Sequence, residues 1–385
     1  MIQKANRLTN VKEYYFSKKL REVAELIKEG KPVINIGIGS PDLQPPSNVV
    51  EALKNTMQLE TAHKYQSYQG IPELRLGIRD FYKVNYNVEL DAATEILPLM
   101  GSKEGIMHIS MAFLNKGDKV LIPDPGYPTY ASVTKLVEAE PVYYNLTKGT
   151  NWLPNFQEIE KNDLSKVKIM WVNYPHMPTG AIALKSDFKQ LISFAKKHNI
   201  LLVNDNPYSF ILNNNPQSIL AIEGAKEVAI ELNSLSKTFN MAGWRVGMVV
   251  GNSEILKIIL QVKSNMDSGM FLGIQKGAVE ALKLSSSWFE KQDIIYEKRR
   301  MLVWKIFDAL DCTYDKNNGG LFVWAKLSKG KKAESFTDEL LYKKNVFITP
   351  GTVFGTNGEG YIRASLCVTE KVLEEVLTRL TPINS

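Results

Sequence analysis

The sequence predicts an α/β protein with a mainly parallel central sheet flanked by helices and a smaller α+β domain. Between residues 46 and 285, helical patterns alternate with short apolar runs rich in β-branched residues, which is typical of parallel strands covered by helices on both faces. After a long helical stretch the pattern changes to short strands and two helices. At 385 residues the chain exceeds what one simple core accommodates, so we expect two domains.

The individual elements follow from local patterns. Apolar residues at helical spacing predict an amphipathic helix at residues 10–29, which ends at Gly30. A turn rich in glycine and proline follows at residues 37–41, and one long helix is expected at residues 286–310. The apolar runs predict large-domain strands at residues 120–123, 142–144, 167–172, 201–204, 228–232 and 246–250, and small-domain strands at residues 320–325, 346–349 and 361–365.

Composition and charge limit the classes of function. The net charge of +6 is small for this length and the lysines are dispersed, so the sequence gives no support for nucleic-acid binding. The two cysteines form no CxxC pair and the four histidines lie far apart, so we expect neither disulfides nor a metal site. The sequence has no apolar run of membrane-spanning length and no secretion-signal pattern at its N-terminus, so we expect a cytoplasmic protein without a membrane partner.

The most informative segment is residues 233–247, in which Lys237 stands among serines and Arg245 follows eight positions later. A lysine amine is a nucleophile only when deprotonated, and cationic or apolar surroundings help by lowering its pKa. Serine hydroxyls and a guanidinium are suitable ligands for a phosphate monoester. A lysine that forms an imine beside a phosphate site indicates pyridoxal 5'-phosphate as the cofactor. The alternative, an exposed loop lysine, accounts for Lys237 alone but not for the whole run.

A carboxylate for the pyridine nitrogen is expected at Asp205, which follows a predicted strand and would project from the carboxyl edge of the sheet. An anion there would keep the ring nitrogen protonated. The alternative is an ordinary turn aspartate before Pro207.

A phosphate site is expected where a glycine turn opens a helix, because a helix N-terminus presents free backbone N–H groups. Ser102 and the amide of Lys103 stand at such a position, although a capping serine alone is the alternative. Ser234, Ser236 and Arg245 would complete the phosphate ligands.

These segments resemble the class I/II aminotransferases of PLP fold type I, and the resemblance runs from residue 37 to residue 366. The form GSKEG at residues 101–105 is most similar to the branch that holds the diaminopimelate aminotransferases. The resemblance implies an N-terminal arm with part of the small domain at residues 1–45. It also implies a large PLP-binding domain at residues 46–285 and a C-terminal small domain at residues 286–385.

The resemblance also implies roles for individual side chains. Tyr208 would act with Lys237 and Asp205 by donating a hydrogen bond to the phenolic oxygen of the cofactor, and Tyr127 would stack on its ring. Tyr65 would reach the phosphate in the neighbouring subunit, which implies a homodimer with shared active sites.

For the substrate, Arg363 resembles the family arginine that binds the α-carboxylate, and bidentate binding would orient the Cα–H bond. Gly39 would let that carboxylate approach the backbone, whereas Tyr14 is expected to pack in the core. One position departs from the family: Met177 replaces the asparagine of N-P-T-G and cannot donate its hydrogen bonds. We do not expect Asn173 to substitute for it.

The sequence therefore predicts a PLP-dependent aminotransferase that moves an amino group from an L-amino acid to an oxo acid such as 2-oxoglutarate. The resemblance favours LL-diaminopimelate or its N-succinyl form as the donor, with Lys103 and Lys64 as partners of the distal charged end. A broad-specificity methionine, aromatic or alanine aminotransferase and a carbon–sulfur lyase on the same scaffold are the alternatives. A PLP sensor fused to a DNA-binding domain is not expected, because few residues precede the first glycine motif.

Overall fold

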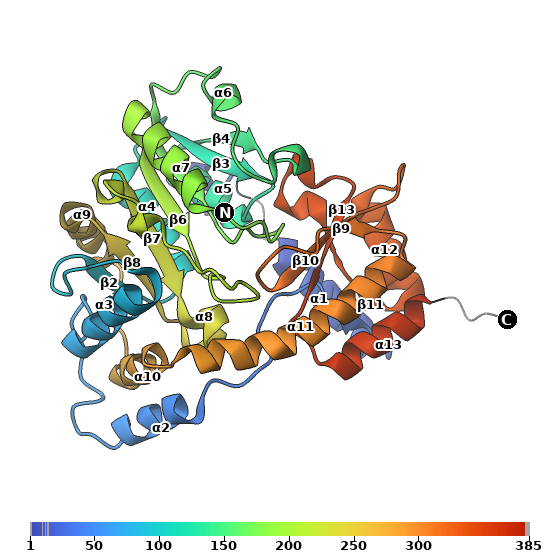
Figure 1. Ribbon diagram of the computed structural model, residues 1–385, viewed down its shortest axis with the longest axis horizontal. Helices are drawn as coiled ribbons and strands as arrows, with labels where there is room; N and C mark the ends of the chain where they lie inside the picture. Colours follow the sequence, from blue (N-terminus) through green and yellow to red (C-terminus); the bar gives the residue numbers. More distant parts are fainter. Residues whose placement is uncertain (1, 10, 12, 14, 382–385) are drawn as a thin grey trace.

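The computed structural model describes residues 2–9, 11, 13 and 15–381, and it has a larger and a smaller lobe (Figure 1). A seven-stranded sheet forms the centre of the larger lobe, and a four-stranded sheet lies in the smaller one. The long helix α11 (Ser286–Ala309) runs along both lobes. Among the described residues, no helix has the combination of length and apolar character that a membrane span requires.

The central sheet has the strand order β2-β8-β7-β6-β5-β3-β4. Strand β8 runs antiparallel to its neighbours β2 and β7, and the remaining neighbouring pairs are parallel. The bounds are β2 (Ile96–Leu99), β3 (Lys119–Asp124), β4 (Glu140–Asn145), β5 (Val167–Val172), β6 (Leu201–Asp205), β7 (Ala229–Ser234) and β8 (Gly247–Gly251).

Helices cover both faces of this sheet, which explains why its strands read as continuous apolar runs. On β5, Ile169 and Trp171 pack toward one face, in the cluster that holds α4, α5 and α9. The alternate residues Met170 and Val172 belong to the cluster on the other face, which includes α3 and α7. These and the remaining helices are α1 (Tyr15–Lys28), α2 (Ser47–Thr56), α3 (Pro72–Tyr86), α4 (Ser102–Phe113), α5 (Pro128–Leu136), α6 (Phe156–Ile159), α7 (Lys185–His198), α8 (Leu235–Thr238), α9 (Ser253–Lys263), α10 (Leu272–Leu282), α12 (Ala333–Lys344) and α13 (Glu370–Leu380).

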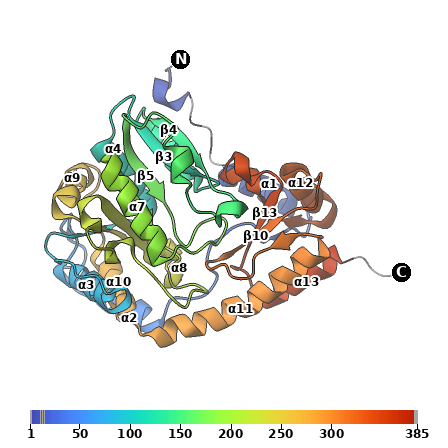
Figure 2. The same ribbon diagram turned by 45° about the horizontal axis from the view of Figure 1, so that its top comes forward.

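The smaller lobe is formed by segments from both ends of the chain. Its antiparallel sheet has the order β12-β13-β10-β9, and β1 pairs separately with β11 in parallel. Helix α1 lies beside this lobe, where Val23 and Leu26 pack on Leu341 and Phe347 (Figure 2). The bounds are β1 (Ile34–Asn35), β9 (Thr313–Tyr314), β10 (Phe322–Lys326), β11 (Val346–Phe347), β12 (Thr349–Pro350) and β13 (Tyr361–Ser365).

The α/β class predicted from the sequence is confirmed, and the expected strands at residues 167–172 and 361–365 have the observed bounds. The single strand expected at residues 346–349 is wrong: β11 pairs with β1, whereas β12 joins the four-stranded sheet. Strand β2 was not expected, because Pro98 interrupts its short apolar run. Residues 10, 12 and 14 of the predicted N-terminal helix, including Tyr14, lie outside the described residues. The domain boundaries at residues 45 and 285 stay a prediction.

Candidate active site

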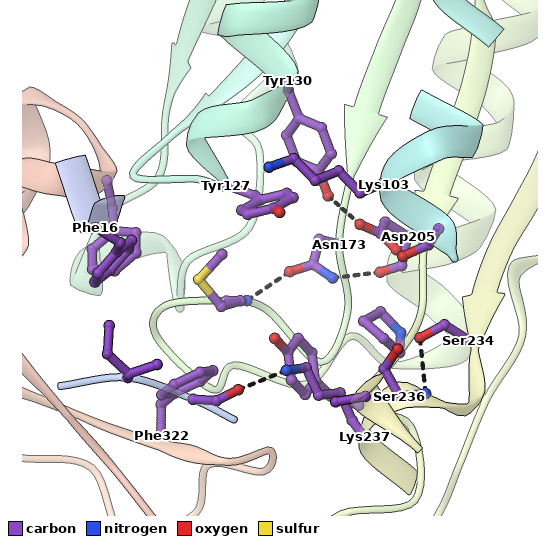
Figure 3. A pocket seen from close by; sticks show the side chains of 18 of the residues that line it. Phe16, Lys103, Tyr127, Tyr130, Asn173, Asp205, Ser234, Ser236, Lys237 and Phe322 are labelled. Carbon is purple, nitrogen blue, oxygen red and sulfur yellow. Dashed lines mark hydrogen bonds between the residues drawn. The ribbon is translucent and has the colours of Figure 1, made fainter. Parts of the chain in front are cut away.

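The carboxyl ends of β6 and β7 face a cavity of about 410 Å³ at which both lobes contribute side chains (Figure 3). All the expected site residues line it except Tyr65. The expected residues that line the cavity are Gly39, Ser102, Lys103, Tyr127, Asp205, Tyr208, Ser234, Ser236, Lys237, Arg245 and Arg363. Residues that are far apart in sequence are thus brought together at the edge of a parallel sheet where ligands usually bind.

Asp205 ends β6, because Pro207 cannot continue the ladder of backbone hydrogen bonds. Its Oδ2 accepts a hydrogen bond of 2.9 Å from the Tyr130 hydroxyl, and its main-chain oxygen accepts one from the Asn173 amide. Within the described part of the chain, Asp205 Oδ1 is buried and has no hydrogen-bond partner. Burial raises the pKa of this carboxyl group to about 7. An unpartnered carboxylate oxygen at a cavity wall fits a protonated ring nitrogen.

Lys237 lies in the short helix α8, directly after β7. Ser234 caps this helix, with its hydroxyl accepting from Ser236 N at 3.3 Å. The Lys237 ammonium donates to the main-chain oxygen of Gly39 at 2.6 Å. Burial is the main cause that lowers the pKa of Lys237, and the guanidinium groups of Arg363 and Arg245 lower it further. A lower pKa increases the neutral, nucleophilic fraction of the amine at neutral pH.

Gly39 is held where no side chain fits. A Cβ atom at this position would overlap the ring of Phe322 on β10. The glycine therefore lets the chain pass between the aromatic ring and Lys237 with its carbonyl group turned to the amine.

An anion site lies where β2 leads into α4. Gly101 takes a positive φ of 94°, and a Cβ atom there would overlap the Arg245 guanidinium. Arg245 Nη1 donates to the Ala242 carbonyl at 2.9 Å and lies 3.5 Å from Ser236 Oγ. The start of α4 at Ser102 thus directs the N–H groups of a helix N-terminus to a place beside the Arg245 guanidinium and a serine hydroxyl. This donor set fits a phosphate monoester.

Two tyrosines complete the part of the cavity around Asp205. The ring of Tyr127 meets that of Tyr130 edge to face, with centroids 5.5 Å apart. Tyr208 is buried and packs edge to face against Phe322 at 5.9 Å. Burial raises the pKa of Tyr208, so its hydroxyl group keeps its proton and is able to donate a hydrogen bond.

Arg363 lies in the middle of β13 and is buried. Its Nη2 donates to the Gly37 carbonyl at 2.8 Å, and its Nη1 lies 3.3 Å from the sulfur of Met177. The guanidinium carbon is 3.8 Å from the ring centroid of Phe322 and 4.5 Å from that of Phe354. The cation is therefore held between two aromatic faces and a thioether, in largely apolar surroundings.

The cavity also holds residues for which the sequence suggested no role. Tyr130 stands three positions after Tyr127, so the helical repeat of α5 was the available signal for it. Asn173 does line the cavity, but its side-chain oxygen accepts from Met177 N at 2.7 Å while its nitrogen donates to the Asp205 carbonyl. Its amide therefore holds two chain segments together.

Tyr65 is 90% exposed and lies outside the residues that line the cavity. The loop that carries it lies against the segment before α10, since the rings of His63 and Phe271 stack at 6.3 Å. Several large apolar side chains of these two segments are exposed: Met57, Leu59, Tyr65, Tyr68, Met266 and Phe271.

A charged cluster lies one turn into α4, behind the anion site. The ligand atoms of Glu104, His108 and Asp267 lie within 4.8 Å of one another. The Lys263 ammonium is 2.9 Å from the Asp267 carboxylate, so a cation already balances this group. Glu104 also accepts the Met100 N–H at 2.6 Å, which braces the turn before Ser102. These contacts favour a structural role in supporting the start of α4.

Comparison with known proteins adds an independent finding. Residues 31–380 match the family model described as aminotransferase class I and II. The LL-diaminopimelate aminotransferase of Dehalococcoides mccartyi is 40% identical over 383 residues, which cover 99% of each chain. The apo structure of Bacillus subtilis BacF has a TM-score of 0.95 at 35% identity and covers 99% of this chain and 98% of its own. An aromatic aminotransferase from Pyrococcus horikoshii OT3 has a TM-score of 0.86 at 30% identity, with coverages of 93% and 97%.

The raised pKa of Asp205 predicts a pH-dependent stability of the cofactor-free protein. The folded state binds this proton more tightly than the unfolded state, so the stabilising contribution is complete below pH 3.8 and is lost as the pH rises through about 7. Asp205→Asn keeps the shape and does not ionise. Between pH 6 and pH 8 it should gain roughly 1 kcal/mol in the free energy of unfolding relative to the wild type.

Urea unfolding of both cofactor-free proteins at each pH measures this difference. The matched control is Asp80→Asn, at an exposed carboxylate on α3. A difference between Asp205→Asn and wild type that stays constant over this range would show that Asp205 does not titrate there.

Proposed function

The chain belongs to the class I and II aminotransferases, and on that premise we propose that it uses pyridoxal 5'-phosphate to move an amino group from an L-amino acid to an oxo acid such as 2-oxoglutarate. Its fold is PLP fold type I. The observation that carries the cofactor proposal is the unpartnered Oδ1 of Asp205, which shares one cavity with the Lys237 amine. The named relatives are aminotransferases, which favours transamination over the carbon–sulfur lyase alternative.

The residues present fit this cofactor at each of its polar groups. Ser102, the Lys103 amide, Ser234, Ser236 and Arg245 would hold the phosphate at the start of α4. Asp205 would accept from the ring nitrogen, and a cation opposite its free oxygen would lower the pKa again and keep the carboxylate ionised. Tyr208 would donate to the phenolic oxygen, and Tyr127 would lie against the ring.

When bound, pyridoxal phosphate supplies an aldehyde that takes up the amino group and a ring that delocalises electrons from the substrate Cα. Lys237 would hold the cofactor covalently, and its amine would move the proton at the substrate Cα. Arg363 binds the α-carboxylate and so fixes the direction of the Cα–H bond. Gly39 leaves room for that carboxylate beside the backbone. In the second half of the reaction the oxo-acid acceptor uses the same groups in reverse.

We further propose a homodimer in which each subunit completes the other's active site. Two observations support this assembly: Tyr65 points to solvent in the single chain, and exposed apolar side chains gather on its loop and on the adjoining segment before α10. Tyr65 would then reach the phosphate held by the partner.

We also propose the division into residues 1–45, 46–285 and 286–385, with side chains from all three parts lining the active site. A cytoplasmic location is proposed because both cysteines are unpaired, which suits a reducing compartment. The identity of the relatives makes LL-diaminopimelate the first donor to test, while the name of the Pyrococcus horikoshii neighbour adds aromatic amino acids.

Lys237→Ala should abolish transamination of every donor, because no other group holds the cofactor covalently or moves the proton at Cα in this proposal. The circular-dichroism spectrum should stay that of the wild type, since the change removes no large core side chain. After borohydride reduction of the wild-type holoenzyme, peptide mapping should find the cofactor on Lys237. A reduced cofactor on any other lysine contradicts the assignment; Lys283→Ala, at an exposed lysine, is the control.

Tyr65→Phe should weaken cofactor binding about tenfold, because one hydrogen bond to a charged phosphate is lost. The change should leave the folded subunit intact, since the side chain is 90% exposed. Equilibrium dialysis against pyridoxal phosphate measures the affinity, and Tyr68→Phe, on the same loop, is the control. An unchanged affinity would show that Tyr65 does not serve a shared site.

Met177→Asn should lower the KM of carboxylate-bearing substrates about fivefold, the effect of one added hydrogen bond of ~1 kcal/mol. Met177→Leu keeps an apolar side chain of similar size and is the matched control. If the asparagine and leucine variants have the same KM, the site has been rebuilt around an apolar residue and the family asparagine does not apply.

A further inference from the structure

The cavity has a second end, on the side away from Asp205. Phe16 and Phe322 lie on that side in Figure 3, whereas Asp205 and Ser234 lie on the other. Most side chains that line this end are apolar, and they come from five segments of the chain: Phe16, Leu20, Ile38, Met177, Phe322 and Phe354. The polar side chain of Ser17, next to Phe16, also lines the cavity. Phe16, Met177, Phe322 and Phe354 contact the guanidinium of Arg363, the group proposed to bind the α-carboxylate.

Apart from Arg363, the charged side chains that line the cavity are Lys103, Asp205, Lys237 and Arg245, which belong to the end proposed to hold the cofactor. Lys103 stands next to Ser102, and its pKa is lowered by burial and by Arg245, which places its charge beside the anion site. Lys64 is exposed and is not among the lining residues. Of the lining residues that the structure describes, Asp205 is the only carboxylate. The two lysines considered as partners for a distal charged end therefore do not lie at the apolar end of this protomer's cavity.

We propose that this apolar end binds the side chain of the amino donor, and that the preferred donors carry a neutral thioether, branched aliphatic or aromatic side chain. The inference rests on the proposed aminotransferase function and names its substrate class. A buried ammonium or carboxylate needs a partner to offset its lost hydration, whereas an apolar side chain gains from leaving water. The distal end of diaminopimelate carries both charges and would meet aromatic rings and a thioether.

Met177 is part of this specificity. A thioether in place of an amide removes a donor for a second carboxylate and adds a soft, apolar surface beside Arg363. The same substitution that weakens binding of charged groups thus extends the apolar wall.

The first test compares kcat/KM of the wild-type holoenzyme for methionine, phenylalanine and leucine with that for LL-diaminopimelate and its N-succinyl form, with 2-oxoglutarate as acceptor. We expect a preference of about tenfold or more for the apolar donors. Equal values, or a preference for either diaminopimelate form, overturn the inference while leaving the aminotransferase function in place. If none of these donors is transaminated, the proposed function itself fails and this inference fails with it.

A second test uses two variants of one helix. Leu20 and Ile27 are both partly exposed apolar residues of α1, at 41% and 51%, but only Leu20 lines the cavity. Leu20→Ala should lower kcat/KM for methionine and phenylalanine several-fold and leave the value for alanine unchanged, because a methyl side chain does not reach it. Ile27→Ala should leave kcat/KM unchanged for all three donors.

The ratio between long and short donors separates substrate contact from a structural role. A loss in Leu20→Ala that is equal for phenylalanine and alanine overturns the proposed contact, since a general disturbance of α1 would produce it.

Discussion

Two groups whose charged forms are disfavoured by burial share one cavity, and this constraint organises the active site. Burial raises the pKa of Asp205 and lowers that of Lys237, so each group is moved toward its neutral form. The Tyr130 hydroxyl satisfies only part of the hydrogen-bonding capacity of Asp205, and the Gly39 carbonyl group only part of that of Lys237. A ligand with a cationic ring nitrogen, a carbonyl carbon and a phosphate group meets each remaining requirement. Binding of such a ligand would therefore stabilise the folded protein.

One short segment fixes the two lobes relative to each other. Residues 37–42 bind Lys237 of the larger lobe through Gly39 and bind Arg363 of the smaller lobe through Gly37. At the end of this segment the Asp42 carboxylate receives both terminal nitrogens of Arg299, at 2.7 and 2.9 Å. Because these contacts are short and buried on at least one side, the distance between the Lys237 amine and the Arg363 guanidinium is set by a few backbone bonds. The glycines are needed there because side chains would fill the space.

The parts of the protein that could be predicted from its sequence are those encoded in short segments. The alternation of strands and helices indicated the fold class, and Lys237 and Arg245 belong to one run, so their proximity follows from local structure. The pairing of Tyr130 with Asp205 spans 75 residues, and the stacking of Phe16 on Arg363 joins opposite ends of the chain. No local pattern specifies such pairs, because they depend on how helices and strands pack. For the same reason the apolar end of the cavity could not be predicted from the sequence, because its residues come from separate segments.

The departure at Met177 is best understood together with the surroundings of Arg363. An asparagine would give the substrate carboxylate a second donor, but it would also bring a polar group that must be hydrated or paired when the cavity is empty of substrate. Methionine leaves the guanidinium between apolar walls, with Phe322 and Phe354 on its faces. In dry surroundings an ion pair with a carboxylate is stronger than in water, since the effective dielectric constant is lower. The stronger attraction offsets part of the lost hydrogen bond, and it does so only for a substrate that keeps the site dry. A donor with an apolar side chain does so, and a donor that brings a second pair of charges does not.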